Sequence, residues 1–226
     1  MTVADILGAS RLVLLDFDGP LCKVFAGLSA DTVARRLREA YASAHGPEAA
    51  ALLSTDDDPL AVVRDAALRD MPHADHLEEL LTALEIEAVD QATPTPHAEG
   101  ALEVLRKDGL RITVVSNNSG TAVSRYVAAR GLTEVVPVVI GRERGHVGRM
   151  KPAPDMLRLA LERQGTSAAE AVMVGDSVTD IQAAQAAGTR SIGYANKPGK
   201  ADALRDAGAD AIIKDMAELS ITVRQR

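Results

Sequence analysis

The sequence predicts an α/β protein with a parallel sheet core, helices on both faces of the sheet, and an inserted all-α domain. After residue 97, short apolar runs alternate with amphipathic stretches, which is typical of βαβ units. Residues 20–96 instead show helical periodicity alone. Because 46% of the 226 residues are apolar and 25% are charged, the chain can bury a core of ordinary size.

The first strand is predicted at residues 11–16, and it ends in two acidic residues one position apart. Asp16 and Asp18 follow the apolar run Leu12–Leu15. Residues at i and i+2 of an extended chain point to the same side, so the two carboxylates face one place and repel each other. A cation relieves that repulsion, which favours a Mg²⁺ site with a carboxylate nucleophile. A polar turn after a buried strand is the alternative interpretation.

Residues 20–96 are predicted to form a helical cap domain, and residues 1–19 and 97–226 a core domain. Cap helices are predicted at about 30–45, 59–70 and 75–89, and residues 93–96 as a stiff, extended tether. The insert carries 6 basic and 14 acidic residues, a net charge of −8, and the remainder has a net charge of +1. We therefore expect a solvated acidic face on the cap and an anionic ligand at the core.

The core domain continues with alternating predicted strands and helices, as in a Rossmann-like sheet. Strands or apolar runs are predicted at 111–116, 135–140, 171–175, 190–194 and 211–213, and helices at about 98–108, 119–130, 153–164 and 178–187. The carboxyl ends of parallel strands meet at one edge of a sheet, where ligands bind. We therefore expect the polar residues that follow these strands to form one site.

Composition disfavours several partners. A net charge of −7 and an aromatic content of 2% argue against a nucleic-acid partner. Apolar runs are shorter than the ~18–20 residues that cross a membrane, and the first residues lack signal-peptide character. Cys22 is the single cysteine, which excludes an intrachain disulfide. We expect a reducing, cytoplasmic setting; the sequence does not indicate the oligomeric state.

Two further strand ends carry candidate phosphate-binding residues. Ser116 and Asn117 follow the strand at 111–116 and precede a helix, where hydroxyl and backbone N–H groups receive phosphate oxygens. The same residues are also an ordinary helix N-cap signal. Lys151 precedes a Pro-initiated helix and could neutralise a transferring phosphoryl group. A solvated lysine is the alternative there.

A third strand end, after residues 171–175, again carries an acidic pair. Asp176 follows Gly175, and Asp180 lies four residues later on the same face of the next helix. Asp176 can ligate a metal, and Asp180 can hold a metal-bound water or orient Lys151. A capped helix with an acidic first turn explains one of these acids but not both.

The order of these motifs resembles the haloacid dehalogenase-like hydrolase superfamily. The strings DFDG, VVSNN, KPAPD and GDSVTD stand in that family's order between about Leu12 and Ile213. A helical insert after the first motif is similar to the capped members, such as phosphoglycolate phosphatases and related sugar-phosphate phosphatases. The resemblance implies a Mg²⁺-dependent phosphomonoester hydrolase that acts on a small phosphorylated metabolite through an aspartyl-phosphate.

The resemblance also implies roles for the acidic residues. Asp16 would attack phosphorus, and Asp18 would protonate the leaving alkoxide and then activate water. Mg²⁺ would be held by the Asp16 carboxylate, the Asp18 backbone carbonyl and the Asp176 carboxylate. Asp180 would lie next to these ligands without binding the metal directly.

The remaining implied roles concern the phosphoryl oxygens. Ser116, the backbone N–H of Asn117 and Lys151 would hold them. The chain departs from the family at Pro20, where members commonly have Thr. This change removes a hydroxyl and a backbone N–H beside the nucleophile, which puts the loop geometry and the rate in doubt.

Four alternative functions are open to this family. Asp18 disfavours a carbon–halogen hydrolase, which has no leaving alkoxide to protonate. Residues 24–96 contain no lysine, which disfavours a phosphonate-cleaving enzyme and weakens the interpretation as a sugar-phosphate mutase. A catalytically silent binding or regulatory protein on this fold is the last alternative, and Pro20 is its best support.

The leaving group is the least defined feature. Basic residues of the cap and hinge are the candidates to contact it: Arg35, Arg36, Arg38, His45, Arg64, Arg69, His73, His76 and His97. The acidic cap disfavours large polyanions, so we expect a small metabolite such as phosphoglycolate. Residues 141–144 are predicted to be a loop that adds positive potential.

Overall fold

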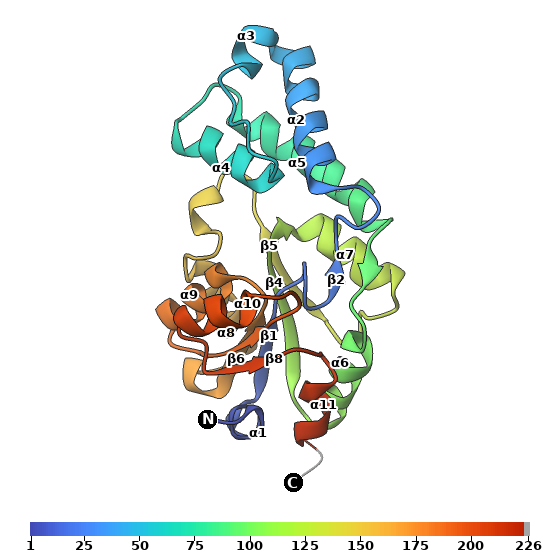
Figure 1. The fold of residues 1–226 in the computed structure, drawn as a ribbon, viewed down its shortest axis with the longest axis vertical. Helices are drawn as coiled ribbons and strands as arrows, with labels where there is room; N and C mark the ends of the chain where they lie inside the picture. The colour runs from blue at the N-terminus through green and yellow to red at the C-terminus, as the bar shows by residue number, and fades with distance from the viewer. Residues whose placement is uncertain (224–226) are drawn as a thin grey trace.

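The computed structural model describes residues 1–223, which contain a six-stranded parallel sheet with helices on both faces (Figure 1). The strand order is β5-β4-β1-β6-β7-β8, and every neighbouring pair is parallel. The strands are β1 (Leu12–Leu15), β4 (Arg111–Ser119), β5 (Val138–Arg142), β6 (Ala171–Gly175), β7 (Arg190–Tyr194) and β8 (Ala211–Ile213). The predicted α/β fold class is confirmed.

β1 lies in the middle of the sheet and is buried on both faces. Leu12 and Leu14 pack with α8 and α9, whereas Val13 and Leu15 pack with α6 and α7. Burial on both faces explains why this strand is an unbroken apolar run rather than an alternating one. The four covering helices are α6 (Ala98–Lys107), α7 (Gly120–Ala129), α8 (Asp155–Gln164) and α9 (Val178–Ala187).

Three short helices outside residues 20–96 were not predicted, and neither was α3 (Pro47–Ala50) within them; the three are α1 (Val3–Ala9), α10 (Lys200–Asp206) and α11 (Glu218–Val223). The first begins with a capping box, in which the Thr2 hydroxyl accepts from the Asp5 N–H and the Asp5 carboxylate accepts from the Thr2 N–H. This signal is readable in the sequence. The other two are short enough that tertiary packing decides them.

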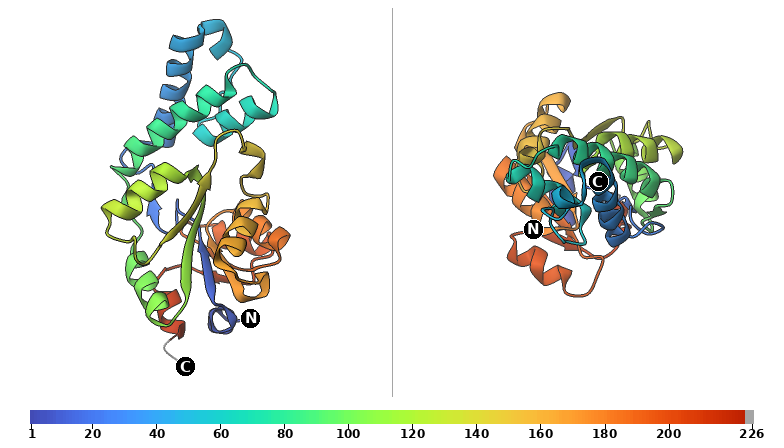
Figure 2. Two further views of the ribbon diagram at one scale, coloured as in Figure 1. Left: turned by 180° about the vertical axis from the view of Figure 1, so that it is seen from behind. Right: turned by 90° about the horizontal axis from the view of Figure 1, so that it is seen from above.

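Residues 20–96, the cap segment, contain four helices that stand over the carboxyl ends of the strands (Figures 1 and 2). They are α2 (Ala30–His45), α3 (Pro47–Ala50), α4 (Pro59–Leu68) and α5 (Ala74–Val89). The cap segment has its own apolar cluster, built around residues such as Leu37 and Leu77. That cluster also contains Val147 and Met150, which belong to the segment between β5 and α8. The interior of the cap is therefore completed by the core.

A short ribbon joins the cap segment to the sheet. β2 (Cys22–Lys23) pairs antiparallel with β3 (Thr93–Pro94), at the residues predicted as an extended tether. The Thr95 hydroxyl donates to the Gly19 carbonyl, and the Thr95 N–H donates to the Leu21 carbonyl at 3.1 Å. Strands of two residues carry no readable periodicity, so the ribbon was not predicted.

Two local predictions are wrong. Residues 141–144 were predicted to be a loop, but β5 extends to Arg142, and Gly141 packs so closely on Gly120 that a Cβ would overlap its backbone. The acidic residues of the cap were expected to be solvated, yet Glu78 and Glu85 are buried. Periodicity does not reveal a buried acid whose partner lies elsewhere in the sequence.

Within residues 1–223, no helix combines the length and apolar character needed to cross a bilayer.

Candidate active site

A cavity of about 450 Å³ lies between the carboxyl ends of the strands and the cap segment. All seven predicted site residues line it: Asp16, Asp18, Ser116, Asn117, Lys151, Asp176 and Asp180. From the cap segment, Phe25, Ala30, Asp57, Asp58, Leu60 and Arg64 complete the wall. The expectation that the polar strand ends form one site is therefore met.

Asp16 directly follows β1 and is held from three directions. Its N–H donates to the Val174 carbonyl at 2.9 Å, continuing the sheet. Its Oδ1 accepts from the Phe17 N–H at 2.8 Å and from Lys151 Nζ at 2.7 Å. Oδ2 receives no hydrogen bond from any described residue, so this carboxylate oxygen is open to a ligand.

Lys151 is buried between two carboxylates, with 2% of its side chain exposed. Nζ lies 2.7 Å from Asp16 Oδ1 and 2.7 Å from Asp180 Oδ1, and it donates to the Val115 carbonyl at 2.8 Å. Burial alone would lower the pKa of Lys151, but the two carboxylates outweigh it and raise that pKa. The ammonium therefore stays protonated.

Asp180 is fully buried in the first turn of α9. Its Oδ2 accepts from the N–H and the hydroxyl of Ser177, at 3.0 and 2.7 Å, in a capping box. A Cβ on Gly175 would overlap the Asp180 side chain, so the glycine before Asp176 makes room for it. Asp180 therefore caps α9 and also lines the cavity beside Lys151.

Asp18 lines the cavity two residues after Asp16. Its Oδ1 accepts from the Val24 N–H at 2.9 Å, where the chain enters the cap segment. Burial raises the pKa of Asp18 to about 6, against the lowering effect of that hydrogen bond. A carboxyl with this pKa exchanges its proton readily near neutral pH.

Asp176 approaches the first motif closely. Gly19 has a φ of 111°, and a Cβ there would overlap the Asp176 carboxylate. Asp176 Oδ2 accepts from Asn196 Nδ2 at 2.8 Å and from the Lys200 ammonium. Neither partner was predicted, although both follow the strand at 190–194. The rule that picked out the other strand ends would have found them.

Three carboxylates form a group that can hold a metal ion. One oxygen each from Asp16, Asp176 and Asp180 lie within 4.8 Å of one another. Burial and the Asp180 carboxylate raise the pKa of Asp16 even with Lys151 beside it, so a further positive charge would favour its ionised form. Carboxylate oxygens are hard ligands. These residues therefore fit a metal ion.

The predicted phosphate-binding residues Ser116 and Asn117 lie within strand β4 rather than at the start of a helix. β4 continues through an irregular register to Ser119, and Ser119 is the residue that caps α7. The Ser116 hydroxyl donates to Asn118 Oδ1 and accepts from the Asn118 N–H, both at 3.1 Å. The Asn117 amide donates to the Lys151 carbonyl at 3.1 Å and accepts from the Lys151 N–H at 2.9 Å. This side chain joins the two predicted phosphate-binding segments.

Of the basic residues proposed to contact a leaving group, only Arg64 lines the cavity. The other cap arginines have partners of their own: Arg35 with Glu39, Arg36 with Glu87, Arg38 with backbone carbonyls, and Arg69 with Asp65. Arg64 has no hydrogen-bond or ion-pair partner among the described residues, and it is half-buried.

The histidines lie outside the cavity. His45, His73 and His76 form a cluster in the cap segment, where His45 Nε2 lies 2.7 Å from His76 Nδ1. His97 pairs with Asp215 at 2.7 Å and is exposed.

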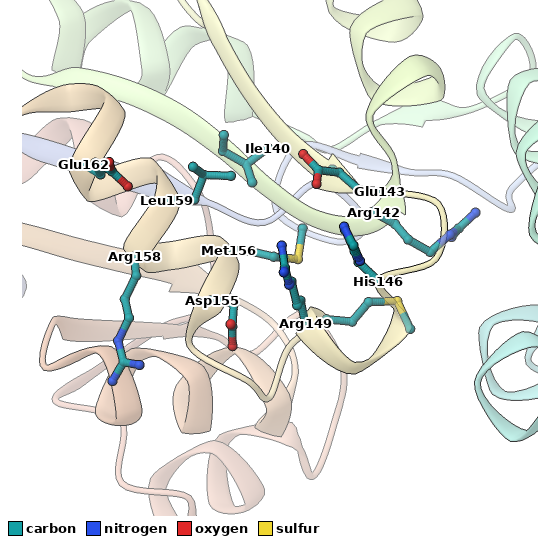
Figure 3. A pocket seen from close by; sticks show the side chains of 12 residues that line it. Ile140, Arg142, Glu143, His146, Arg149, Asp155, Met156, Arg158, Leu159 and Glu162 are labelled. Atoms are coloured by element: carbon teal, nitrogen blue, oxygen red, sulfur yellow. The ribbon is translucent and has the colours of Figure 1, made fainter. Parts of the chain in front are cut away.

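A second cavity, of about 230 Å³, lies beside the segment between β5 and α8 (Figure 3). It is lined by the apolar side chains of Ile140, Met156 and Leu159 together with charged ones such as Arg149. None of the predicted site residues lines it. Of these two cavities, the predicted site residues therefore line only the larger one.

The fold and the site together define an α/β protein with a carboxylate-rich site at its strand ends, covered by inserted helices. The chain belongs to the haloacid dehalogenase-like hydrolase family, whose model matches residues 13–194. The resemblance predicted from the motifs is confirmed.

Individual relatives and structures are similar over different spans. The plasmid phosphoglycolate phosphatase of Cupriavidus necator is 35% identical over 55% of this chain, a match that spans only 53% of that protein. The phosphoglycolate phosphatase of Rhodospirillum rubrum is 28% identical over 92% of this chain and 89% of its own length. A crystal structure of a predicted phosphatase from Clostridium acetobutylicum matches with a TM-score of 0.74 at 17% identity, covering 96% of this chain and 99% of that one.

Proposed function

We propose that this protein is a Mg²⁺-dependent phosphomonoester hydrolase that acts on a small phosphorylated metabolite through an aspartyl-phosphate on Asp16. The observation that carries the proposal is the Lys151 ammonium, 2.7 Å from both Asp16 and Asp180 on the floor of the cavity. A buried lysine so placed neutralises charge at the point where a phosphoryl group would meet Asp16. In this proposal, residues 20–96 act as the cap domain and the rest as the core domain.

Asp16 supplies the nucleophile. Its Oδ2, free of hydrogen bonds from the described residues, attacks phosphorus, and the bond from phosphorus to the ester oxygen breaks. Oδ1 stays bound to the Phe17 N–H and to Lys151, which fixes the carboxylate for attack.

Asp18 supplies the proton transfers. With a pKa raised to about 6, it gives its proton to the departing alkoxide. The resulting carboxylate then takes a proton from water, whose oxygen attacks the phosphorus of the aspartyl-phosphate. Inorganic phosphate leaves, the Asp16 carboxylate is restored, and Asp18 is protonated again.

The Asp16 and Asp176 carboxylates and the Asp18 backbone carbonyl are the proposed metal ligands. Bound Mg²⁺ would neutralise phosphoryl charge and orient the ester. Asp180 is committed to Ser177 and Lys151, so its proposed role is to hold the lysine in place. Ser116, the Asn117 N–H and Lys151 are the proposed ligands of the phosphoryl oxygens.

Arg64 supports a carboxylate-bearing substrate such as phosphoglycolate, which is the leading candidate; sugar phosphates, which lack a carboxylate, are the second candidate. A half-buried guanidinium without a protein partner is suited to a carboxylate of the leaving group. Asp57 and Asp58 on the same wall add negative charge, which disfavours bulky polyanions. The names of the relatives from Cupriavidus and Rhodospirillum support the same substrate.

The proposal is tested by phosphate release from a panel of small phosphomonoesters, with and without Mg²⁺, for wild type and Asp16→Asn. Metal-dependent release that the substitution abolishes is the expected result, and the best substrate identifies the branch. Absence of release from every ester would contradict the proposal and favour the mutase or silent-binding alternatives. The cytoplasmic setting predicted from the sequence stays a prediction.

A further inference from the structure

The cap segment and the core share one buried ion pair near the proposed phosphate site. Glu85 on α5 and Arg142 at the end of β5 meet with side-chain exposures of 0% and 2%. Two parallel hydrogen bonds join them, from Nη1 to Oε1 at 2.9 Å and from Nη2 to Oε2 at 3.0 Å. In Figure 3, Arg142 extends away from the other labelled side chains of the smaller cavity. Arg142 also lines that cavity, but its guanidinium pairs with Glu85 at the boundary between cap and core.

Glu85 has two further donors, both in the segment that carries the proposed phosphate ligands. Asn118 Nδ2 donates to Oε1 at 3.2 Å, and the Ser119 N–H donates to Oε2 at 2.9 Å. A carboxylate only accepts hydrogen bonds, so it forces the Asn118 amide to point its NH₂ group at Glu85. The Asn118 oxygen then faces the Ser116 hydroxyl, which donates to it at 3.1 Å.

Arg142 contacts Asn117, whose backbone N–H is another of the proposed phosphate ligands. Its Nη1 also donates to the Asn117 carbonyl at 3.0 Å. The side chain of Asn117 in turn holds the backbone of Lys151 through two hydrogen bonds, at 2.9 and 3.1 Å. One buried pair is thus connected to Ser116 through Asn118 and to Lys151 through Asn117.

We propose that Glu85 and Arg142 are positioning residues, which make the placement of Ser116 and Lys151 depend on the docking of the cap segment. The inference rests on the proposed function, because it concerns groups that would hold phosphoryl oxygens. Neither residue touches the substrate; both act through the asparagines. Helix α5 is therefore a structural part of the phosphate site as well as part of its cover.

The matched experiment compares Glu85→Gln with Glu87→Gln. Both glutamates lie on α5 and both accept two hydrogen bonds from an arginine, but Glu87 pairs with Arg36 on the exposed face of the cap. Glu85→Gln replaces one carboxylate oxygen with an NH₂ group, so a donor would face Arg142 and either Asn118 or Ser119, which donate hydrogen bonds to Glu85. The readouts are the Kd for inorganic phosphate at fixed Mg²⁺, kcat on an aryl phosphate, and the unfolding midpoint.

We expect Glu85→Gln to weaken phosphate binding and lower kcat by about 10- to 100-fold at temperatures where the variant is folded. Glu87→Gln should stay within about twofold of wild type. If Glu85→Gln is folded and keeps both the Kd and kcat of wild type, with only a lower unfolding midpoint, the pair is purely structural and the inference is overturned.

A second variant decides the matter if Glu85→Gln does not fold. Asn118→Ser removes the link between Glu85 and Ser116 but leaves the ion pair and the Ser119 hydrogen bond. The expected result is the same weakening of phosphate binding and loss of kcat with little change in the unfolding midpoint; unchanged values would overturn the inference. A wild type that binds phosphate but hydrolyses no ester would contradict the proposed function instead, and the phosphate Kd would still test the positioning.

Discussion

The ion pairs at the strand ends and those on the surface of the cap segment differ in their burial. At the strand ends, Lys151 contacts Asp16 and Asp180 with side-chain exposures of 2%, 11% and 0%. On the cap surface, Arg36 and Glu87 form an equally short pair at 2.7 Å, but with exposures of 37% and 45%. Distance therefore does not separate the two kinds of pair, whereas burial does.

The difference in burial determines how much each ion pair contributes to stability. Water and salt screen the exposed pairs, so each contributes little to stability. The buried charges persist only because each has a partner, and removing one partner leaves the other desolvated. The cap segment has a net charge of −8, but the two charges proposed to have a function are Glu85, which faces the core, and Arg64, which lines the cavity.

The largest predicted effect is at the nucleophile. Asp16→Asn keeps the shape and the acceptor for the Phe17 N–H but removes the reactive carboxylate, so we expect phosphate release to fall by about 10⁴-fold or more. The measurement is steady-state phosphate release with saturating Mg²⁺. If Asp16→Asn retains a sizeable fraction of wild-type turnover, Asp16 is not the nucleophile, and the strand-end charges have no functional role that sets them apart from the surface charges.

The next effect concerns stability at the same site. Lys151→Met leaves Asp16 and Asp180 buried without their cation, so the free energy of unfolding should fall by about 3–5 kcal/mol. Arg36→Met, which breaks an exposed pair, should leave it unchanged within error. Urea denaturation of both variants makes the comparison, and equal losses would show that burial is not the deciding factor.

Stabilisation of the protein by Mg²⁺ should depend on the carboxylates at the strand ends and not on acidic residues elsewhere. At a Mg²⁺ concentration 100-fold above Kd, the protein should gain about 2.7 kcal/mol of unfolding free energy. Asp176→Asn removes one proposed ligand and should abolish most of that gain. Thermal unfolding with and without Mg²⁺ measures it, with Asp202→Asn on exposed α10 as the control that keeps the full gain.

Arg64 tests the inward face of the cap. Arg64→Gln should raise KM for phosphoglycolate by about 10- to 100-fold, because a charge-assisted hydrogen bond contributes about 1.5–3 kcal/mol. KM for an aryl phosphate, which lacks the carboxylate, should not change. Arg69→Gln, one residue beyond the end of α4, is the control, since Arg69 pairs with Asp65 instead. Equal increases in KM for both substrates would show that Arg64 maintains the structure of the cap and does not bind the substrate carboxylate.

The smallest effect is expected on the outer face of the cap. Arg35 and Glu39 form an exposed i,i+4 pair at 2.9 Å. Arg35→Gln should leave both the unfolding midpoint and kcat indistinguishable from wild type. A clear loss in either measurement would show that the outer charges of the cap also contribute to function.

The sequence predicted the elements whose signals are local. The strand at 171–175 and the helix at 178–187 have the predicted bounds, because an apolar run and a capped helix are read within one short window. The gathering of Asp16, Lys151 and Asp180 followed from the rule that parallel strand ends meet at one edge.

The features that were missed depend on contacts far apart in the sequence. Glu85 reads as one more acid on a cap helix, and Arg142, 57 positions later, reads as a loop residue until β5 places them together. The ribbon of β2 and β3 is likewise held by pairing across the insert rather than by its own residues. The partners of a buried charge are set by topology, which periodicity does not report.

The most direct test of the account is to trap the intermediate. Wild type and Asp16→Asn are mixed with phosphoglycolate and Mg²⁺, quenched in acid during turnover, treated with borohydride and digested with trypsin. An aspartyl-phosphate on Asp16 predicts homoserine at position 16 in the peptide covering residues 12–23, and only in the wild type. Sustained phosphate release with an unmodified Asp16, or with the modification at another residue, would contradict the account.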